Sequence, residues 1–299
     1  MVTGTVLERE GSTYRILTPA GEVRAVLRGK MKRDTPKVVV GDRVELDTEV
    51  ETGLLAIAAV AERKSLLARR VPEGRGTRPV AANVDQVLVV AAARDPEPVP
   101  QLIDRLLVVA EANQIPAAVI VNKTDLDGAG ALRARFTRAG YEVLATSVKA
   151  GTGIEALRER LRGRESVVTG PSGVGKSSLL NALEPGLQLR TGEISAKVRR
   201  GTHTTVSAVM VPLQQGGFLV DTPGFSEVGL WGLEPRELPE CFPEFRPFLG
   251  QCRYADCSHV HEPGCAVLAA LAAGTVDATR VESYRVLLSE LQDQPADWE

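Results

Sequence analysis

The sequence lacks the features that mark several classes of protein. Its 36 Lys and Arg residues nearly balance 38 Asp and Glu residues, leaving a net charge of −2. No overall field therefore attracts nucleic acid or an anionic membrane, and such contacts require local patches. The longest apolar runs, Val87–Ala93 and Ala266–Ala273, are far shorter than the roughly 20 residues that span a bilayer. We also expect no secretory signal, because no basic region leads into an apolar stretch after Met1.

Cysteine is also scarce. Four cysteines are too few for a disulfide scaffold, and three of them lie within Cys252–Cys265, which indicates a metal site in a reducing compartment. A chain of 299 residues is too long for one ordinary domain. With 43% hydrophobic and 25% charged residues, the composition is that of a folded protein. We therefore expect a soluble, cytoplasmic protein of two or three domains.

The first 60 residues contain short strand-like segments separated by glycines. Five such segments at this spacing predict a small barrel, with an OB-fold as the leading candidate over residues 1–62. The segments are Thr5–Arg9, Tyr14–Leu17, Glu22–Leu27, Asp42–Leu46 and Leu54–Val60.

Two basic clusters lie in and after this region. The first has six basic residues against Asp34 alone: Arg24, Arg28, Lys30, Lys32, Arg33 and Lys37. The second, Arg63–Arg78, also carries six basic residues against Glu73, and its prolines and glycines indicate a loop, which we assign as a basic linker over residues 63–80. Beside a barrel, such clusters suit an RNA phosphate backbone. The alternative is ordinary solvated surface charge.

From residue 81 the pattern changes to strands alternating with helices. Apolar runs flanked by amphipathic segments predict a largely parallel sheet covered on both faces, over residues 81–230. The expected strands are Asp85–Ala91, Ala117–Val121, Tyr141–Thr146, Ser166–Thr169, Thr205–Val211 and Gly217–Asp221, and the expected helices are Val99–Ala112, Ala129–Ala139, Ile154–Leu161 and Gly175–Leu183. Residues 231–299 are acidic and loop-rich, with helices expected at Ala266–Ala273 and Val281–Leu291.

A phosphate-binding loop is indicated between an expected strand and an expected helix. The glycines let backbone N–H groups surround a phosphate, and the helix N-terminus adds a partial positive charge. Lys176 would reach the β- and γ-phosphates, and the Ser177 hydroxyl would ligate Mg²⁺. The alternative is a glycine-rich turn without a ligand. The expected nucleotide contacts are Gly170, Pro171, Ser172, Gly173, Val174, Gly175, Lys176, Ser177 and Ser178.

A second motif indicates that the base is guanine. In Asn122–Asp125, which includes Lys123, the Asp125 carboxylate can accept hydrogen bonds from N1–H and the exocyclic amine of guanine. Adenine offers no such pair, and an unpaired carboxylate would penalise it. The turn Ser147, Val148 and Lys149 also follows a strand, and could offer a backbone N–H to the guanine O6 and lay a lysine stem on the ring.

Two further segments complete a GTPase set. Asp221 at a strand end can hold Mg²⁺ through water, and the Gly224 N–H can meet the γ-phosphate. A polar loop, Arg199–Thr205, precedes them, and one of its threonines could complete the Mg²⁺ shell. All of these lie at strand ends of a parallel sheet, where α/β proteins bind ligands.

The order of these motifs is rotated relative to the usual GTPase. The base motifs come first and the phosphate-binding loop follows them. Such a rotation is physically permissible, because neighbouring termini can be joined and a surface loop opened. It places the switch segments at the C-terminal end of the GTPase domain, next to whatever follows.

A cysteine and histidine cluster follows the GTPase motifs. Cys252, Cys257, His259 and Cys265 form a Cys₃His set suited to a closed, structural Zn²⁺ site. The alternatives are scattered buried thiols, or His261 in place of His259. Cys241 is more typical of a core thiol than of a ligand.

Taken together, the chain resembles the RsgA/YjeQ family of circularly permuted bacterial GTPases. The resemblance rests on the rotated order, the barrel, the His203–Thr205 loop and the spacing of the four zinc ligands. It implies an OB-fold, a permuted α/β P-loop GTPase domain and, over residues 231–299, a zinc-containing helical domain. It also implies GTP, Mg²⁺ and one structural Zn²⁺, and a cytoplasmic monomer that acts on the small ribosomal subunit and its 16S rRNA, with no membrane or DNA partner.

The resemblance also implies roles for switch residues. Thr205 would sense Mg²⁺, and His203 would be catalytic or position the attacking water; the catalytic set is then His203, Thr205, Lys176, Asp221 and Gly224. Thr202 stands where the family often has a basic residue, which puts part of any RNA contact by this loop in doubt, and Val148 stands where Ala is common.

Phe225 follows Gly224 where many small GTPases keep a glutamine that orients water. A phenyl ring cannot do this, so we expect slow intrinsic turnover that the small subunit stimulates. Two other functions are compatible with the sequence. One is a non-enzymatic RNA-binding checkpoint that senses GTP, and the other is a GTPase of another pathway whose barrel binds protein.

Overall fold

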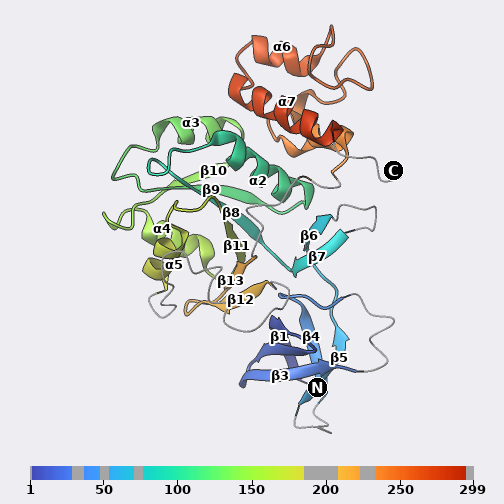
Figure 1. Ribbon diagram of the computed structural model, residues 1–299, viewed down its shortest axis with the longest axis vertical. Coiled ribbons are helices and arrows are strands. Elements are labelled where there is room, and N and C mark those ends of the chain that lie inside the picture. Colours follow the sequence, from blue (N-terminus) through green and yellow to red (C-terminus); the bar gives the residue numbers. More distant parts are fainter. Residues whose placement is uncertain are drawn as a thin grey trace.

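The chain forms three parts in sequence order (Figure 1). A computed structural model describes residues 2–28, 37–47, 54–70, 77–184, 208–222, 230 and 233–293, with the side chains of Arg69, Arg70 and Thr77 left out. A small barrel lies at one end of the molecule, a mixed sheet with helices lies in the middle, and a helical part lies at the other end.

The N-terminal strands close into a barrel, as expected for an OB-fold. Each strand pairs with two others in the order β1–β2–β3–β5–β4–β1, and the β3–β5 pairing is parallel. Alternate side chains such as Tyr14, Ile16 and Leu46 are buried inside it. The strands are β1 (Val2–Glu10), β2 (Thr13–Thr18), β3 (Gly21–Leu27), β4 (Arg43–Asp47) and β5 (Leu55–Val60).

The central sheet has the order β10–β9–β8–β11–β13–β12. All of its pairings are parallel except that of β12 with β13. Strand β8 is buried along its whole length, as its unbroken apolar run predicted. The strands are β8 (Gln86–Ala92), β9 (Ala117–Asn122), β10 (Glu142–Ala145), β11 (Glu165–Thr169), β12 (Val209–Pro212) and β13 (Phe218–Asp221).

Four helices cover the two faces of this sheet. One face packs on the first pair of helices through Val87, Val89 and Val119, and the other packs on the second pair through Leu88 and Val90. The first pair is α2 (Pro100–Ala112) and α3 (Gly130–Arg138), and the second is α4 (Ile154–Leu161) and α5 (Lys176–Leu183). The predicted doubly covered sheet is confirmed, and it places the ends of β9, β11 and β13 at one edge.

The expectation that residues 63–78 form an irregular loop is wrong. Strands β6 (Leu66–Arg70) and β7 (Thr77–Ala82) form an antiparallel hairpin. Leu67 and Ala81 are fully buried in the main core, so packing against the rest of the protein stabilises the hairpin. Pro79 lies where the register shifts, a position at which a strand tolerates a residue without an N–H. The prolines and glycines therefore interrupt a hairpin and do not exclude one.

The barrel is joined to the central sheet. Glu8 of β1 pairs with Val209 of β12, so the two sheets form one continuous eleven-stranded sheet. The Asn83 side chain donates to the Gly41 carbonyl at 2.8 Å, and Arg43 pairs with Glu165 at the start of β11. A Cβ at Gly41, whose φ is +85°, would collide with the Ala82 carbonyl. This close approach fixes the barrel against the hairpin.

The C-terminal part is held to α2 and α3. Its elements are the 3₁₀ helices η4 (Pro235–Cys241) and η5 (Arg246–Phe248) and the helices α6 (Ala266–Ala272) and α7 (Ala278–Gln292), so both predicted C-terminal helices are present. Arg280 of α7 is fully buried and donates to Asp104 of α2 at 2.6 Å. Among the described residues, no helix has the length and apolar character needed to cross a bilayer.

Candidate functional site

The predicted phosphate-binding loop runs from the end of β11 into α5. Gly170, Gly173 and Gly175 have φ values of +142°, +80° and +94°, which L side chains rarely adopt. A Cβ at Gly170 would also collide with the Val90 carbonyl, and one at Gly175 with the Asn122 amide. The glycines are therefore required both by the turn and by the close approach of two neighbouring strands.

Two side chains at the start of α5 face this loop. The Lys176 ammonium donates to the Gly170 and Pro171 carbonyls, each at 2.7 Å, which holds it over the turn. Burial lowers the pKa of Lys176, and the nearby Asp221 opposes this effect. Ser177 is buried at the first turn of the helix. A cation and a hydroxyl placed together beside curled backbone are the groups that bind a phosphate and its metal ion.

Asn122 connects the two predicted halves of the site. Its amide nitrogen donates to the Val174 carbonyl of the phosphate-binding loop at 2.9 Å, although the two residues are 52 positions apart. Its amide oxygen accepts from the Thr146 hydroxyl at 3.2 Å. Because Asn122 is buried, both hydrogen bonds are made away from solvent. One side chain therefore aligns the ends of β9 and β11 with the segment after β10.

Asp125 is oriented by the third segment. The Ser147 hydroxyl donates to the Asp125 carboxylate at 2.5 Å and accepts from the Ala150 N–H at 3.0 Å. The Ser147 hydrogen bond lowers the pKa of Asp125, to which Lys149 and Lys123 also contribute. Asp125 itself is exposed, so its carboxylate is ionised, fixed at one oxygen and open to a ligand.

The other predicted base-contacting residues are Lys123, Val148 and Lys149, which belong to the same two segments as Asp125 and Ser147. Lys123 has a left-handed φ of +59°, and its ammonium donates to the Asp95 carbonyl in the loop after β8. Val148 is half-buried against the core, and Lys149 is exposed. The loop after β8 also approaches the phosphate-binding loop, because a Cβ at Gly173 would lie 3.6 Å from Pro96.

Asp221 ends β13 on the other side of β11. Burial raises its pKa to about 7, and the neighbouring Lys176 acts in the opposite direction. Because burial makes the charged form of this carboxylate unfavourable, a bound cation would stabilise that form.

Several predicted residues lie outside the described part of the chain. These are His203, Thr205 and Gly224 of the catalytic set and Lys30, Lys32 and Arg33 of the basic cluster.

Of the described members of that cluster, Arg24 pairs with Glu10 at 3.1 Å and Arg28 pairs with Asp47. Lys37 is exposed, and no ion pair is recorded for it within the described ranges.

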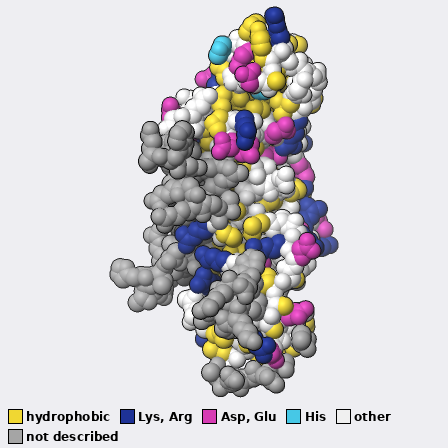
Figure 2. Space-filling view, turned by 90° about the vertical axis from the view of Figure 1, so that its right-hand side faces the viewer, with side chains coloured by type: hydrophobic (Ala, Val, Ile, Leu, Met, Phe, Trp, Pro, Cys, Tyr) yellow, Lys and Arg dark blue, Asp and Glu magenta, His cyan; other side chains and the backbone are white. Residues whose placement is uncertain are grey.

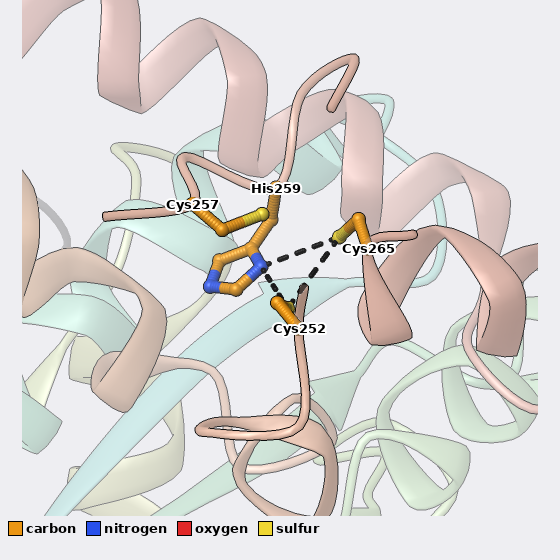
Figure 3. Close-up of side chains that lie close together, drawn as sticks. All are labelled: Cys252, Cys257, His259 and Cys265. Carbon is orange, nitrogen blue, oxygen red and sulfur yellow. Dashed lines mark hydrogen bonds between the residues drawn. The ribbon is translucent and has the colours of Figure 1, made fainter. Parts of the chain in front are cut away.

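The predicted zinc ligands converge (Figure 3). The ligand atoms of Cys252, Cys257, His259 and Cys265 all lie within 4.8 Å of one another. The Cys252 and Cys265 sulfurs are 3.9 Å apart, and His259 Nδ1 lies 3.5 and 3.4 Å from them. Tetrahedral Zn²⁺ requires about 3.8 Å between sulfurs and about 3.6 Å between sulfur and nitrogen. The donor set therefore fits zinc, with His259 as the histidine.

The other two candidates in this region are excluded from the cluster. His261 is exposed, and Cys241 is a buried core thiol whose Sγ lies 3.6 Å from the Glu237 carbonyl. Burial lowers the pKa of His259, which favours the neutral imidazole that metal binding requires.

Several residues that support the sites were not indicated by any motif. Glu262 accepts from the backbone N–H groups of Ser258, Val260 and His261 at 2.8 to 3.1 Å, which shapes the zinc loop. Tyr284 of α7 donates to the Ser258 carbonyl at 2.7 Å. Thr146 likewise supports Asn122. Only its position directly before the Ser147 turn could have drawn attention to it.

Comparisons with known proteins agree with this geometry. A model of the RsgA GTPase family matches residues 60–231. A protein of Gemmatimonas aurantiaca, described as small ribosomal subunit biogenesis GTPase RsgA, is 50% identical over 298 residues, which cover 97% of each chain. A protein of Moorella thermoacetica with the same description is 42% identical and covers 96% of this chain and 97% of its own.

Two solved structures have the same fold. The crystal structure of YjeQ from Thermotoga maritima superposes with a TM-score of 0.81 at 36% identity, and covers 98% of this chain and 99% of that chain. YloQ, described as a circularly permuted GTPase, superposes with a TM-score of 0.78 at 27% identity, and covers 99% of this chain and 97% of its own. The description of YloQ as circularly permuted agrees with the rotated motif order of this chain.

Proposed function

Because the chain belongs to the RsgA GTPase family, we propose that it binds GTP at the described site, hydrolyses it on the small ribosomal subunit during late maturation, and then leaves. The observation that carries the site assignment is the hydrogen bond from Asn122 to the Val174 carbonyl. It brings a base-reading segment and a phosphate-binding segment to one place. The relatives that match the whole chain are named for small-subunit biogenesis, which supports the partner.

The base is selected by the segments after β9 and β10. Asp125 accepts from the N1–H and amine of guanine, while Ser147 keeps the carboxylate in position. Val148 and Lys149 close the turn beside the base. Asn122 contributes by aligning the two segments, so it is a positioning residue in this scheme.

The phosphates are bound by the segment after β11. Backbone N–H groups of the loop from Gly170 to Gly175 face the phosphate oxygens, and the helix α5 begins at this point. Lys176 exchanges its two carbonyl contacts for phosphate oxygens. Ser172 and Ser178 supply further hydroxyls at this segment.

Ser177, Asp221 and Thr205 are the residues proposed to hold Mg²⁺. Bound there, the ion neutralises charge on the β- and γ-phosphates. Asp221 can serve because a divalent cation offsets the burial that raises its pKa. The zinc cluster has no position left for water once four ligands bind, so its metal is proposed to be structural.

Hydrolysis requires a group that positions water, since Phe225 cannot. We assign this role to His203, with Thr205 and Gly224 as its partners in the switch segments. Intrinsic turnover should be slow, and the small subunit should increase it by ordering these segments. The proposed domain ranges are 1–62 for the barrel, 81–230 for the GTPase domain and 231–299 for the zinc-binding part; the range 63–80, expected as a linker, belongs to the β6–β7 hairpin. The protein is proposed to act as a cytoplasmic monomer.

The test is GTP turnover measured with purified small subunits, with large subunits and with neither. We expect stimulation by small subunits alone, and equal turnover in all three would overturn the proposal. His203→Ala should lose the stimulated rate, by analogy with the 10²- to 10⁴-fold effects of positioned acid–base groups. His261→Ala, which changes an exposed histidine outside the zinc cluster, is the matched control and should retain it.

A further inference from the structure

We propose that Glu262 is the residue that positions Cys257 and His259 for zinc, by holding the backbone of the loop that carries them. Glu262 is not one of the four groups that converge in this part of the chain, so its role is to place ligands and not to be one. This role rests on the proposal that the cluster holds zinc. It adds a determinant of metal affinity that the spacing of the cysteines and the histidine does not reveal.

The loop from Cys257 to Cys265 contains no helix or strand, so its backbone polar groups need other partners. It also contains a conformation that is unfavourable on its own. His259 has a φ of +60°, in the left-handed region that residues other than glycine rarely adopt. Such a conformation persists only when surrounding contacts enforce it. The histidine ligand therefore needs support from residues other than itself.

The Glu262 carboxylate binds N–H groups on both sides of His259. Its Oε1 accepts from the Ser258 N–H at 2.8 Å and from the Ser258 hydroxyl. Its Oε2 accepts from the Val260 and His261 N–H groups, each at 3.1 Å. Hydrogen bonds to a charged acceptor are stronger than those between neutral groups. One side chain therefore fixes the backbone immediately before and after the histidine ligand.

Side chains of α7 bind carbonyl groups of the same stretch. The Tyr284 hydroxyl donates to the Ser258 carbonyl at 2.7 Å, and Arg285 donates to the Val260 carbonyl at 3.1 Å. Tyr284 is itself buried in the main core, so this side of the loop is anchored to a core helix. In the part of the chain that the structure describes, the recorded side-chain partner of the N–H groups on both sides of the histidine is Glu262.

Glu262 also connects the other ligands of the cluster. Ser258 directly follows Cys257, so fixing its backbone restrains that thiol. The Glu262 carbonyl accepts from the Cys265 N–H at 3.3 Å. Figure 3 shows Cys257 and His259 on one stretch of loop and Cys265 approaching from another, with the ligand atoms close together. Glu262 lies between these stretches in the sequence and contacts both.

A general effect of negative charge is the alternative explanation. A carboxylate near a bound cation would attract it even without these hydrogen bonds. Figure 2 shows further Asp and Glu side chains on the surface of the C-terminal part, at the upper end of that view. Asp256 is exposed and directly precedes Cys257. Asp256→Asn therefore removes the same charge beside a ligand and is the matched control.

A carboxylate that orders the loop before the metal arrives should increase metal affinity, because less ordering remains to be done on binding. Removing a group that orients metal ligands typically weakens binding by about 10- to 100-fold. Glu262→Ala removes every hydrogen bond of the carboxylate. Glu262→Gln keeps the length of the side chain but replaces one acceptor oxygen with an NH₂ group, which faces backbone donors and cannot accept from them.

The test measures the zinc dissociation constant of the full chain by competition with a chelator, for wild type, both Glu262 variants and Asp256→Asn. Visible absorption of the Co²⁺-loaded proteins reports whether three thiolates and one imidazole still bind in tetrahedral geometry. Melting temperatures with excess zinc show whether each variant is folded. If Glu262→Ala is not, Glu262→Gln decides alone.

We expect zinc affinity to fall about 100-fold in Glu262→Ala and about 10-fold in Glu262→Gln, with the wild-type Co²⁺ spectrum kept at saturating metal. Asp256→Asn should stay within about threefold of wild type, because an exposed charge is screened. Unchanged affinity in the Glu262 variants, or an equal loss in Asp256→Asn, would overturn the inference. So would a changed Co²⁺ spectrum in Glu262→Gln, since this would make Glu262 a ligand. A wild-type chain that binds no zinc would refute the zinc site and this role with it, and the wild-type titration separates that failure from the others.

Discussion

Ser147 holds the carboxylate that we propose to read the base, and its own hydroxyl is not free to contact that base. That hydroxyl is committed between the Ala150 N–H and the Asp125 carboxylate. Asp125 is exposed, and this hydrogen bond orients its carboxylate and is the largest cause of its lowered pKa. Removing either partner should therefore weaken guanine recognition, but by different amounts.

Asp125→Asn should lose discrimination for guanine by several kcal/mol, because an amide replaces the acceptor that guanine requires. Ser147→Ala should cost only about 0.5 to 1.5 kcal/mol in GTP affinity, the worth of one ordinary hydrogen bond. Calorimetric titration with GTP and ATP measures both. Thr124→Ala is a nearby control that removes a hydroxyl bound, at 3.1 Å, to the Thr146 backbone carbonyl and not to the Asp125 carboxylate. Equal binding of GTP by wild type and Asp125→Asn would contradict the base assignment.

Glu165 lies where the barrel meets the central sheet. One carboxylate oxygen binds Arg43, and the other is buried with no hydrogen-bond partner among the described residues. Burial raises the pKa of Glu165 to about 7, although Arg43 lowers it in part. The folded protein therefore keeps a proton on Glu165 at pH values where the unfolded chain has released it.

The free energy of unfolding should consequently fall as the pH rises from about 4.5 to about 7, since the folded state binds more protons there. Above pH 7 this contribution is constant. Glu165→Gln does not titrate and should lack this fall, which we expect to be on the order of 1 kcal/mol after screening. Urea unfolding at several pH values provides the measurement, and Glu142→Gln, at an exposed ion pair, is the control. Parallel curves for wild type and Glu165→Gln would rule out the shift.

For individual residues, the sequence predicted which side chains form the candidate sites better than it predicted which residues those side chains contact. The residues of the nucleotide and zinc motifs could be named because their spacing is local and their roles need particular side chains. The Asn122 bridge to Val174 could not be derived, because a hydrogen bond between residues 52 positions apart depends on the finished sheet. The pairing of Arg24 with Glu10 was hidden for the same reason: a count of charges does not show which ones neutralise each other across strands.

Among the elements, strands and helices with clear periodicity were predicted to within a few residues. The β6–β7 hairpin was missed because its stabilisation comes from Leu67 and Ala81 in the main core, which is a tertiary effect. The 3₁₀ helices η4 and η5 were also missed, since short proline-containing turns have no periodic signal.

The loop that carries Cys252, Cys257, His259 and Cys265 is the element that we propose to depend on a bound metal. Cys257→Ser should lose the bound zinc and lower the melting temperature, because metal-binding free energy contributes directly to folding of such loops. Cys241→Ser changes a buried thiol outside the cluster and should retain the metal. Zinc content and thermal unfolding measured on both variants provide the check. Equal zinc content in the two would show that the cluster is not the site.

At the scale of the whole molecule, a buried charge network joins the C-terminal part to the central sheet, beside the hydrophobic core that the two share. Arg280 donates to Asp104 of α2 and to Glu244 at 2.5 Å, and stacks over Phe242 at 4.5 Å. Arg135 of α3 binds the same Asp104 carboxylate. These contacts attach the C-terminal part to the two helices α2 and α3 of the central sheet.

Arg280→Met should destabilise the protein by about 3 to 5 kcal/mol, because it leaves Glu244 and half of Asp104 without the cation that their burial requires. Arg105→Met is the matched control. Its pair with Glu290 joins the same two parts but is partly exposed, so it should cost less than about 1 kcal/mol. Urea unfolding distinguishes them. Similar losses in the two variants would mean that the buried network has no special weight.

The pairing of β1 with β12 has a consequence for how the chain can be divided. In the described sheet, β12 lies between β13 and the barrel, so its outer backbone groups are covered only by β1. A fragment without the barrel would present β12 as an unprotected sheet edge, which invites strand-to-strand aggregation. The barrel thus covers an edge of the central sheet that would otherwise be open to pairing with another strand, whatever else the barrel binds.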